Sequence, residues 1–126
     1  MNIVDSSGWL EYFSDGPNAD CFAETLGNVS ELLVPTIIMY EVFKIIYRQR
    51  GEDSALQATA LMQQGRIIEL SLSIALLAAK LSLEAKLPMA DSIILATAQT
   101  NNATLWTQDN DFEGLQGVRY FQKISP

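Results

Sequence analysis

The side chains most able to do chemistry in this sequence are carboxylates, because the chain has no histidine and one cysteine, Cys21. Those two counts exclude the usual Cys/His zinc sites, a disulfide framework and any mechanism that needs an imidazole base. The acids that stand out by position are Asp5, Glu41, Asp91 and Asp109, with Asp111 beside the last. Carboxylates that converge repel one another unless a cation neutralises them, and hard oxygen ligands select Mg²⁺ or Mn²⁺.

The reaction that such a site favours is phosphodiester hydrolysis. A divalent ion eases deprotonation of a coordinated water for in-line attack on phosphorus, and it offsets charge on the phosphate oxygens. The chain carries a formal charge of −7, and an acidic surface repels a phosphate backbone unless a cation bridges the two. Lys44, Arg48 and Arg50 gather in one expected helix, where they fit either phosphate contacts or an ordinary solvated face.

The size of the chain predicts one domain. Its 126 residues, 48% of them apolar, suit a single core, so residues 1–126 are expected to form one nuclease domain. No basic segment precedes an apolar run at the start, and no apolar run approaches the roughly 20 residues that cross a bilayer. A cytoplasmic protein is therefore expected.

The elements that must position the acids alternate between short apolar runs and helical patterns. Strands are predicted at residues 2–4, 31–35, 66–70 and 103–107, with a possible fifth at 118–121. Helices are predicted up to residue 13 and at residues 19–26, 36–50, 54–64, 73–86 and 89–100. This alternation is typical of βαβ units, and it predicts an α/β three-layer sandwich around a parallel sheet of four to five strands.

The acids fall where such a sheet binds ligands, outside the carboxyl ends of its strands. Asp5 follows the first strand and Asp109 the fourth, while Asp91 lies in the first turn of a helix. Glu41 lies one to two turns into the helix after the second strand. The sequence therefore places all of them at one edge of one sheet.

Each acid also has an ordinary structural explanation. Asp5 fits an N-cap, Asp91 is favoured by the helix dipole, and Glu41 fits an exposed ion pair with Lys44 or Arg48. The segment "TQDNDF" fits an Asx-rich turn. These explanations account for the acids singly, but they do not explain why the acids share one edge.

Four segments in series resemble a known family. They are "NIVDSSGW", Pro35 followed by Glu41, "LPMADSIILATA" and "LWTQDNDF". In this order and at this spacing they resemble a PIN domain, specifically the VapC-type toxin ribonucleases of prokaryotic toxin–antitoxin pairs. The resemblance implies a parallel sheet between helices, an acid cluster that binds Mg²⁺ or Mn²⁺, and endonucleolytic cleavage of RNA.

The resemblance also assigns roles to residues. Asp5 and Asp91 would be metal ligands, and Asp109 would bind the metal or an outer-shell water. Glu41 would shape the metal site or position a water. Among the supporting residues, Ser6 and Thr107 would orient carboxylates or water. Both Asp109 and Asp111 are candidates for the fourth acid. Asp109 is favoured because it follows Thr107 by two residues, and Asp111 would then cap a short helix beginning near Phe112.

The resemblance further implies partners: an RNA substrate, a VapB-like antitoxin whose tail lies near the acids, and a second copy in a homodimer. Tyr40, Phe43, Ile46 and Tyr47 share one helix side, for which core packing is favoured over a contact surface. The alternatives are a PIN-like module that binds RNA or protein without cleavage, and a receiver-type Mg²⁺-binding domain. A receiver domain usually has an acidic pair after its first strand and a lysine after its last, and this sequence has neither. A phosphatase or DNA nuclease with the same acids also stays open.

Overall fold

The sheet at the centre of the molecule is parallel throughout. The computed structural model describes residues 1–125. Its strands are β1 (Asn2–Val4), β2 (Leu32–Pro35), β3 (Arg66–Ile68), β4 (Thr104–Thr107) and β5 (Val118–Tyr120). They pair in the order β3-β2-β1-β4-β5, and every pair is parallel. The predicted α/β sandwich with a parallel sheet is confirmed.

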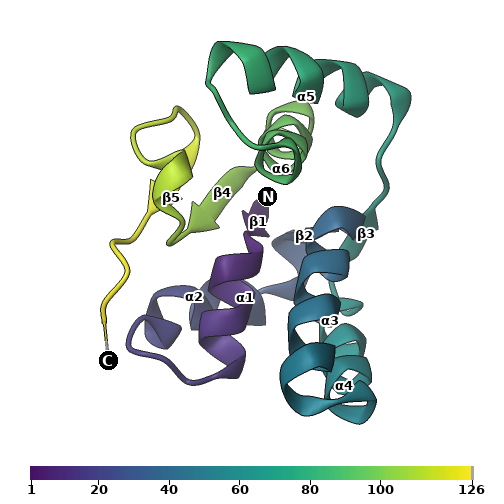
Figure 1. Cartoon of the computed structure of the whole chain (residues 1–126), viewed down its shortest axis with the longest axis vertical. Coiled ribbons are helices and arrows are strands. Elements are labelled where there is room, and N and C mark those ends of the chain that lie inside the picture. The colour runs from purple at the N-terminus through teal and green to yellow at the C-terminus, as the bar shows by residue number, and fades with distance from the viewer. Residues whose placement is uncertain (126) are drawn as a thin grey trace.

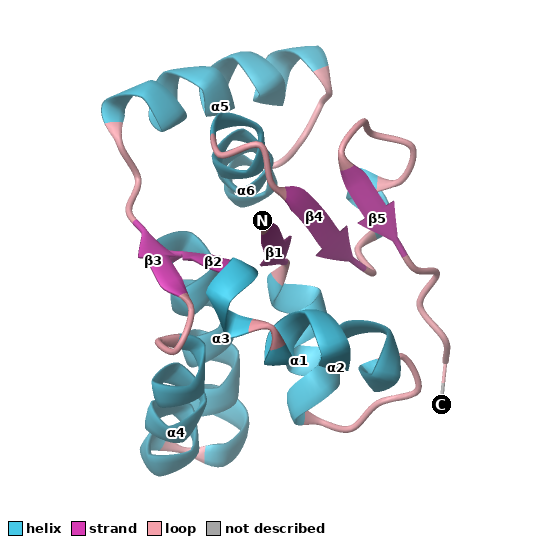
Figure 2. Cartoon of the chain, turned by 180° about the vertical axis from the view of Figure 1, so that it is seen from behind, coloured by secondary structure: helices cyan, strands magenta, loops and turns pink. Residues whose placement is uncertain are grey.

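The helices flank this sheet in two groups. They are α1 (Ser6–Phe13), α2 (Ala19–Gly27), α3 (Thr36–Arg50), α4 (Glu52–Met62), α5 (Leu72–Glu84) and α6 (Met89–Thr100). Two short 3₁₀ helices, η1 (Val29–Glu31) and η2 (Asn110–Phe112), complete the chain. In Figure 1, α5 and α6 lie above the strands and α1 to α4 below them, and Figure 2 shows the same division from behind. The predicted helices all form, with ends displaced by a few residues in some cases.

The core explains why the strands are apolar runs. Strands covered on both faces read as continuous hydrophobic sequence, and Leu32, Leu33 and Val34 of β2 are buried. Ile3 and Val4 of β1 are also buried. At the outer strand β3, in contrast, the first two residues are exposed. Asp5 directly follows the buried strand β1, and Asp109 lies two residues after the end of β4.

Two glycines set the local geometry. A Cβ at Gly8 would lie 2.6 Å from Cγ1 of Val4 and 2.9 Å from the Phe22 ring, so only glycine lets α1 approach β1 this closely. Gly51 has φ of 89° between α3 and α4, a conformation that glycine adopts without strain. Gly8 matters for the site, because it lies one turn after Asp5.

Candidate functional site

Asp5 is the most deeply placed acid of the site. It follows β1, its N–H donates to the Trp106 carbonyl at 2.9 Å, and it is 2% exposed. Its carboxylate does not cap α1; Oδ2 instead accepts hydrogen bonds from Ser7 Oγ (2.8 Å) and Thr107 Oγ1 (2.9 Å). Burial raises the pKa of Asp5, partly opposed by these two hydroxyls. Asp5 therefore occupies the N-cap position of α1, but the alternative that its side chain merely caps the helix is wrong, because this side chain is bonded to Thr107 at the end of β4.

Glu41 joins Asp5 through a serine. Ser6 Oγ donates to Glu41 Oε1 at 3.0 Å and lies 3.4 Å from Asp5 Oδ1. Burial raises the pKa of Glu41, the Ser6 hydroxyl lowers it, and the charges of Asp5 and Asp109 raise it further. Within residues 1–125 no ion pair joins Glu41 to Lys44 or Arg48. The exposed ion pair that would have explained Glu41 is therefore absent.

Asp91, Asp109 and Asp111 form the tightest group of acids. One carboxylate oxygen from each lies within 4.8 Å of the others. Asp91 comes from the first turn of α6, while the other two come from the loop after β4. Burial raises the pKa of Asp91 to about 8, and a hydrogen bond with Asp111 and the charge of Asp109 act in the same direction. A divalent cation would offset the desolvation and the mutual repulsion of these carboxylates.

The loop after β4 is held by the threonine that precedes it. Thr107 is fully buried, and its Oγ1 accepts the Asp109 N–H at 2.9 Å while donating to Asp5. The sequence assigned the cap of the short helix near Phe112 to Asp111, and this is wrong. Asp109 is the N-cap of η2, and its Oδ1 accepts the Asp111 N–H at 3.0 Å. An Asx-type turn thus presents both carboxylates to Asp91.

All the residues singled out from the sequence lie in this region. Asp91, Asp109 and Asp111 form one group; Asp5 is joined to Asp109 of this group by the Thr107 hydroxyl, and Glu41 is joined to Asp5 by the Ser6 hydroxyl. Sequence reasoning gave Ser7 no role in the site, although its Oγ donates to Asp5 and accepts the Gln108 N–H at 3.2 Å. The two consecutive serines after Asp5 were the sequence feature that could have indicated this role of Ser7. Oxygen atoms supply every potential ligand, which fits a hard divalent cation.

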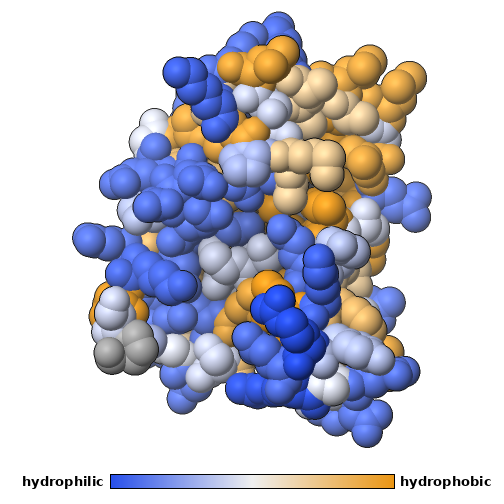
Figure 3. Space-filling model, in the orientation of Figure 1, coloured by the Kyte–Doolittle hydropathy of each residue, from blue (hydrophilic) through white to orange (hydrophobic). Residues whose placement is uncertain are grey.

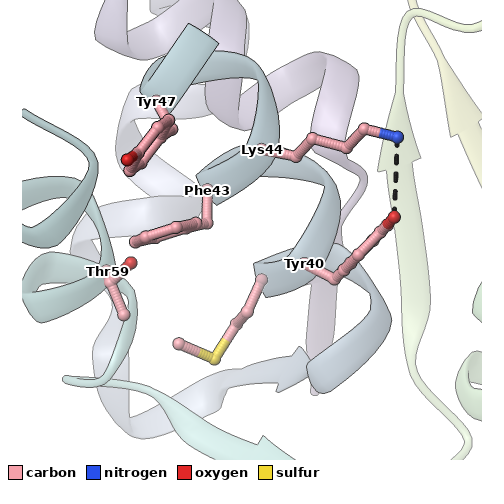
Figure 4. A pocket seen from close by; sticks show the side chains of 6 residues that line it. Tyr40, Phe43, Lys44, Tyr47 and Thr59 are labelled. Carbon is pink, nitrogen blue, oxygen red and sulfur yellow. Dashed lines mark hydrogen bonds between the residues drawn. The ribbon is translucent and has the colours of Figure 1, made fainter. Parts of the chain in front are cut away.

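A second surface lies between α3 and α4. Tyr40, Phe43 and Tyr47 line an apolar hollow of about 570 Å³ together with Met39, Lys44 and Thr59. Figure 4 shows Phe43 and Tyr47 directed from α3 toward Thr59 of α4. Tyr40 is 59% and Tyr47 49% exposed, whereas Ile46 is buried. The expected core packing of this helix side therefore holds for Ile46 but not for the two tyrosines.

The fold and the acids together define a class of protein: a parallel α/β domain with a carboxylate cluster at the carboxyl ends of its strands. Residues 3–118 match the family model of the PIN domain, so the chain belongs to the PIN domain family. No curated protein sequence matches the chain. Between residues 1 and 125, no helix combines the length and apolarity needed to cross a membrane.

Solved structures agree on the fold. A toxin–antitoxin complex from Klebsiella pneumoniae is 28% identical, with a TM-score of 0.81 over 94% of this chain and 96% of that one. Mycobacterium tuberculosis VapC20, a Sarcin-Ricin loop cleaving toxin, is 16% identical, with a TM-score of 0.73 over 92% and 95%. FitAcB from Neisseria gonorrhoeae is 18% identical, with a TM-score of 0.75 over 97% of each chain.

Proposed function

We propose that this protein is a divalent-metal-dependent endoribonuclease and the toxin of a toxin–antitoxin pair. The observation that carries the proposal is the group formed by Asp91, Asp109 and Asp111 beside the buried Asp5. Membership of the PIN domain family and the 28% identical Klebsiella toxin–antitoxin complex support the toxin assignment, and the Sarcin-Ricin loop cleaving toxin VapC20 shares the fold.

In this proposal Asp5, Asp91 and Asp109 hold Mg²⁺ or Mn²⁺. The ion supplies Lewis acidity, which eases deprotonation of water and offsets charge on a phosphate. Ser7 and Thr107 fix the orientation of the Asp5 carboxylate through their hydrogen bonds, so this side chain need not rearrange to bind the ion. Glu41, held by Ser6, orients a water at the margin of the group.

The test is RNA cleavage by the purified protein with Mg²⁺ or Mn²⁺. Wild type should cut RNA, excess chelator should stop it, and Asp5→Asn should lose more than about a hundredfold, since even partners of metal ligands are worth 10–100-fold. Asp53→Asn, which changes an exposed acid in the first turn of α4, is the matched control and should keep full activity. Undiminished cleavage by Asp5→Asn in chelator would reject the metal mechanism. Cleavage of DNA alone would indicate a DNA nuclease, and RNA binding without cleavage the non-catalytic alternative.

The two loop acids should differ in their contribution. Asp109 is half-buried and its N–H is bound by Thr107, while Asp111 is exposed, so Asp109 is the better-ordered ligand. Asn can replace Asp109 as the η2 cap, so Asp109→Asn should leave the melting temperature nearly unchanged. We expect Asp109→Asn to lose roughly tenfold or more in cleavage rate relative to Asp111→Asn. Equal losses would show that both acids complete the site together.

The proposed antitoxin is a small protein with an apolar segment and a basic tail. The hollow between α3 and α4 offers aromatic surface for the apolar segment. The acid group would attract a basic side chain, and the net charge of −7 favours a basic partner. A short adjacent reading frame that encodes a DNA-binding start and a basic or aromatic tail would support this partner; a chromosomal neighbourhood without one would favour a nuclease that acts without an antitoxin.

The proposed homodimer would use α5. Leu72, Leu76 and Leu83 are 77%, 64% and 84% exposed and lie along one side of the helix. Figure 3 shows hydrophobic residues gathered at the upper right, over the beginning of α5. Light scattering should give a dimer for wild type and a monomer for Leu76→Glu. Leu56→Glu, at an exposed leucine of α4, should stay dimeric; a monomeric wild type would exclude this interface.

A further inference from the structure

A polar hollow of about 520 Å³ opens beside the acids, on the β5 side of the sheet. Ser7 and Asp109 of the acid site line it together with Gln108, Asn110, Tyr120, Gln122 and Lys123. Its volume lies within the roughly 300–1,000 Å³ that is usual for small-molecule sites. Since the hollow shares Ser7 and Asp109 with the acid site, a molecule bound there lies next to the acids.

Buried polar groups hold the walls of the hollow in place. Asn18, which is 4% exposed, donates from Nδ2 to Gln108 Oε1 and to the Gln122 carbonyl, both at 3.0 Å. Gln108, 6% exposed, in turn donates from Nε2 to Glu11 Oε1 at 3.2 Å. Both the oxygen and the nitrogen of the Gln108 amide are thus hydrogen-bonded, which fixes the orientation of this side chain.

The segment after β5 is fixed by the same side of the sheet. The Phe121 N–H donates to the Thr107 carbonyl at 2.9 Å. Its ring stacks on Trp106 with centroids 6.0 Å apart and meets Phe22 edge-on at 5.4 Å. This anchoring, with the bond from Asn18 to the Gln122 carbonyl, holds the segment that brings Lys123 to the hollow.

Three side chains of the hollow have free polar groups. Within residues 1–125, the Tyr120 hydroxyl, the Asn110 amide and the Lys123 ammonium form no hydrogen bond or ion pair. Together they offer an aromatic ring, an amide with both donor and acceptor, and a cation. A nucleotide has the complementary groups: a base to stack, base edges and hydroxyls to hydrogen-bond, and a phosphate.

We propose that this hollow binds the nucleotide adjoining the scissile phosphate of a single-stranded RNA, an inference that rests on the proposed ribonuclease function. The base stacks on Tyr120, Lys123 contacts the phosphate of that nucleotide, and Asn110 hydrogen-bonds the base edge or the ribose. A base can reach Tyr120 only when it is unstacked from its neighbours, so paired RNA is excluded. The hollow thereby adds a positive contact to a site whose other charged side chains are acids.

The test uses steady-state cleavage of an RNA that wild type cuts. Lys123→Gln and Tyr120→Leu should each raise KM by about tenfold, because one stacked base or one phosphate contact is lost, and kcat should stay within about twofold. Lys123→Gln should also reduce the slope of log affinity against log salt by about 0.7, the value for one phosphate on a single strand. Arg66→Gln removes the same charge at the exposed start of β3, the edge strand opposite β5, and should alter neither quantity.

The outcomes separate the two proposals. If wild type cuts RNA but Lys123→Gln and Tyr120→Leu both behave like Arg66→Gln, the hollow is not a nucleotide subsite and the ribonuclease proposal stands. If wild type cuts no RNA with either metal, both proposals fail. Tyr120 belongs to β5, so if Tyr120→Leu lowers the melting temperature, Lys123→Gln and its salt slope decide. Lys123→Arg keeps the positive charge and should restore KM.

Discussion

Replacing Asp91 by asparagine is expected to lower RNA cleavage by more than about a hundredfold, because a metal ligand should matter more than the outer-shell groups that are worth 10–100-fold. Asp91 lies in the first turn of α6 within 4.8 Å of oxygens from Asp109 and Asp111. Asparagine is nearly isosteric but carries no charge, so the fold should persist.

The same change should stabilise the protein when metal is absent. The pKa of Asp91 is raised to about 8, which means that the ionised carboxylate is unfavourable in the folded state. In chelator at pH above 8, Asp91→Asn should therefore melt at a higher temperature than wild type. Asp53→Asn, at a helix start outside the acid group, should show neither the loss of activity nor the gain in stability. Full activity of Asp91→Asn would remove Asp91 from the metal site.

The second large effect concerns pH and metal together. Asp91 has a usual pKa of 3.8 and a folded-state pKa of about 8, so folding binds a proton. The stability due to this proton is fully present below about pH 4 and is lost as pH rises through about 8. The pKa values of Asp5 and Glu41 are raised too, so their contributions have the same sign.

We therefore expect the melting temperature of the metal-free protein to fall between pH 5 and pH 8.5. Each 1 kcal/mol lost should lower it by roughly 4 °C for a domain of this size. Mg²⁺ or Mn²⁺ should reverse the fall at high pH and do little at pH 5, because the ion competes with protons for the carboxylates. Differential scanning fluorimetry with and without metal measures both effects. A metal-free melting temperature that rises over this range would contradict the raised pKa values.

Local sequence was enough to predict the elements and their order. The apolar runs of β1 and β2 are buried on both faces, and such runs indicate a parallel sheet without knowledge of their partners. Pro35 and Gly51 mark the ends of α3 because fixed φ and positive φ are properties of single residues. The ends of the helices were predicted less accurately than the helices themselves. Helix α5, for example, begins one residue and ends two residues earlier than predicted.

The candidate acids were predicted from the sequence, but the residues that hydrogen-bond to them were not. The absence of histidine and the position of each acid after a strand or in a helix start predicted an oxygen-ligand site. Only the tertiary structure showed that Ser6 joins Asp5 to Glu41, and that Asp109, not Asp111, caps η2. Only the tertiary structure showed, likewise, that Lys123, near the end of the chain, lines a hollow together with Ser7, near its start.

The physical reason for this difference is how far apart in the sequence the interacting residues lie. Periodicity, turn preference and strand burial depend on residues within a few positions, so the amino-acid sequence determines them directly. Whether Asp5 accepts a bond from Thr107, 102 positions away, depends on the pairing of β1 with β4 and on the packing of Gly8 against Val4. The sequence by itself thus determined the fold class and the acids, and the tertiary structure decided which oxygen atoms meet.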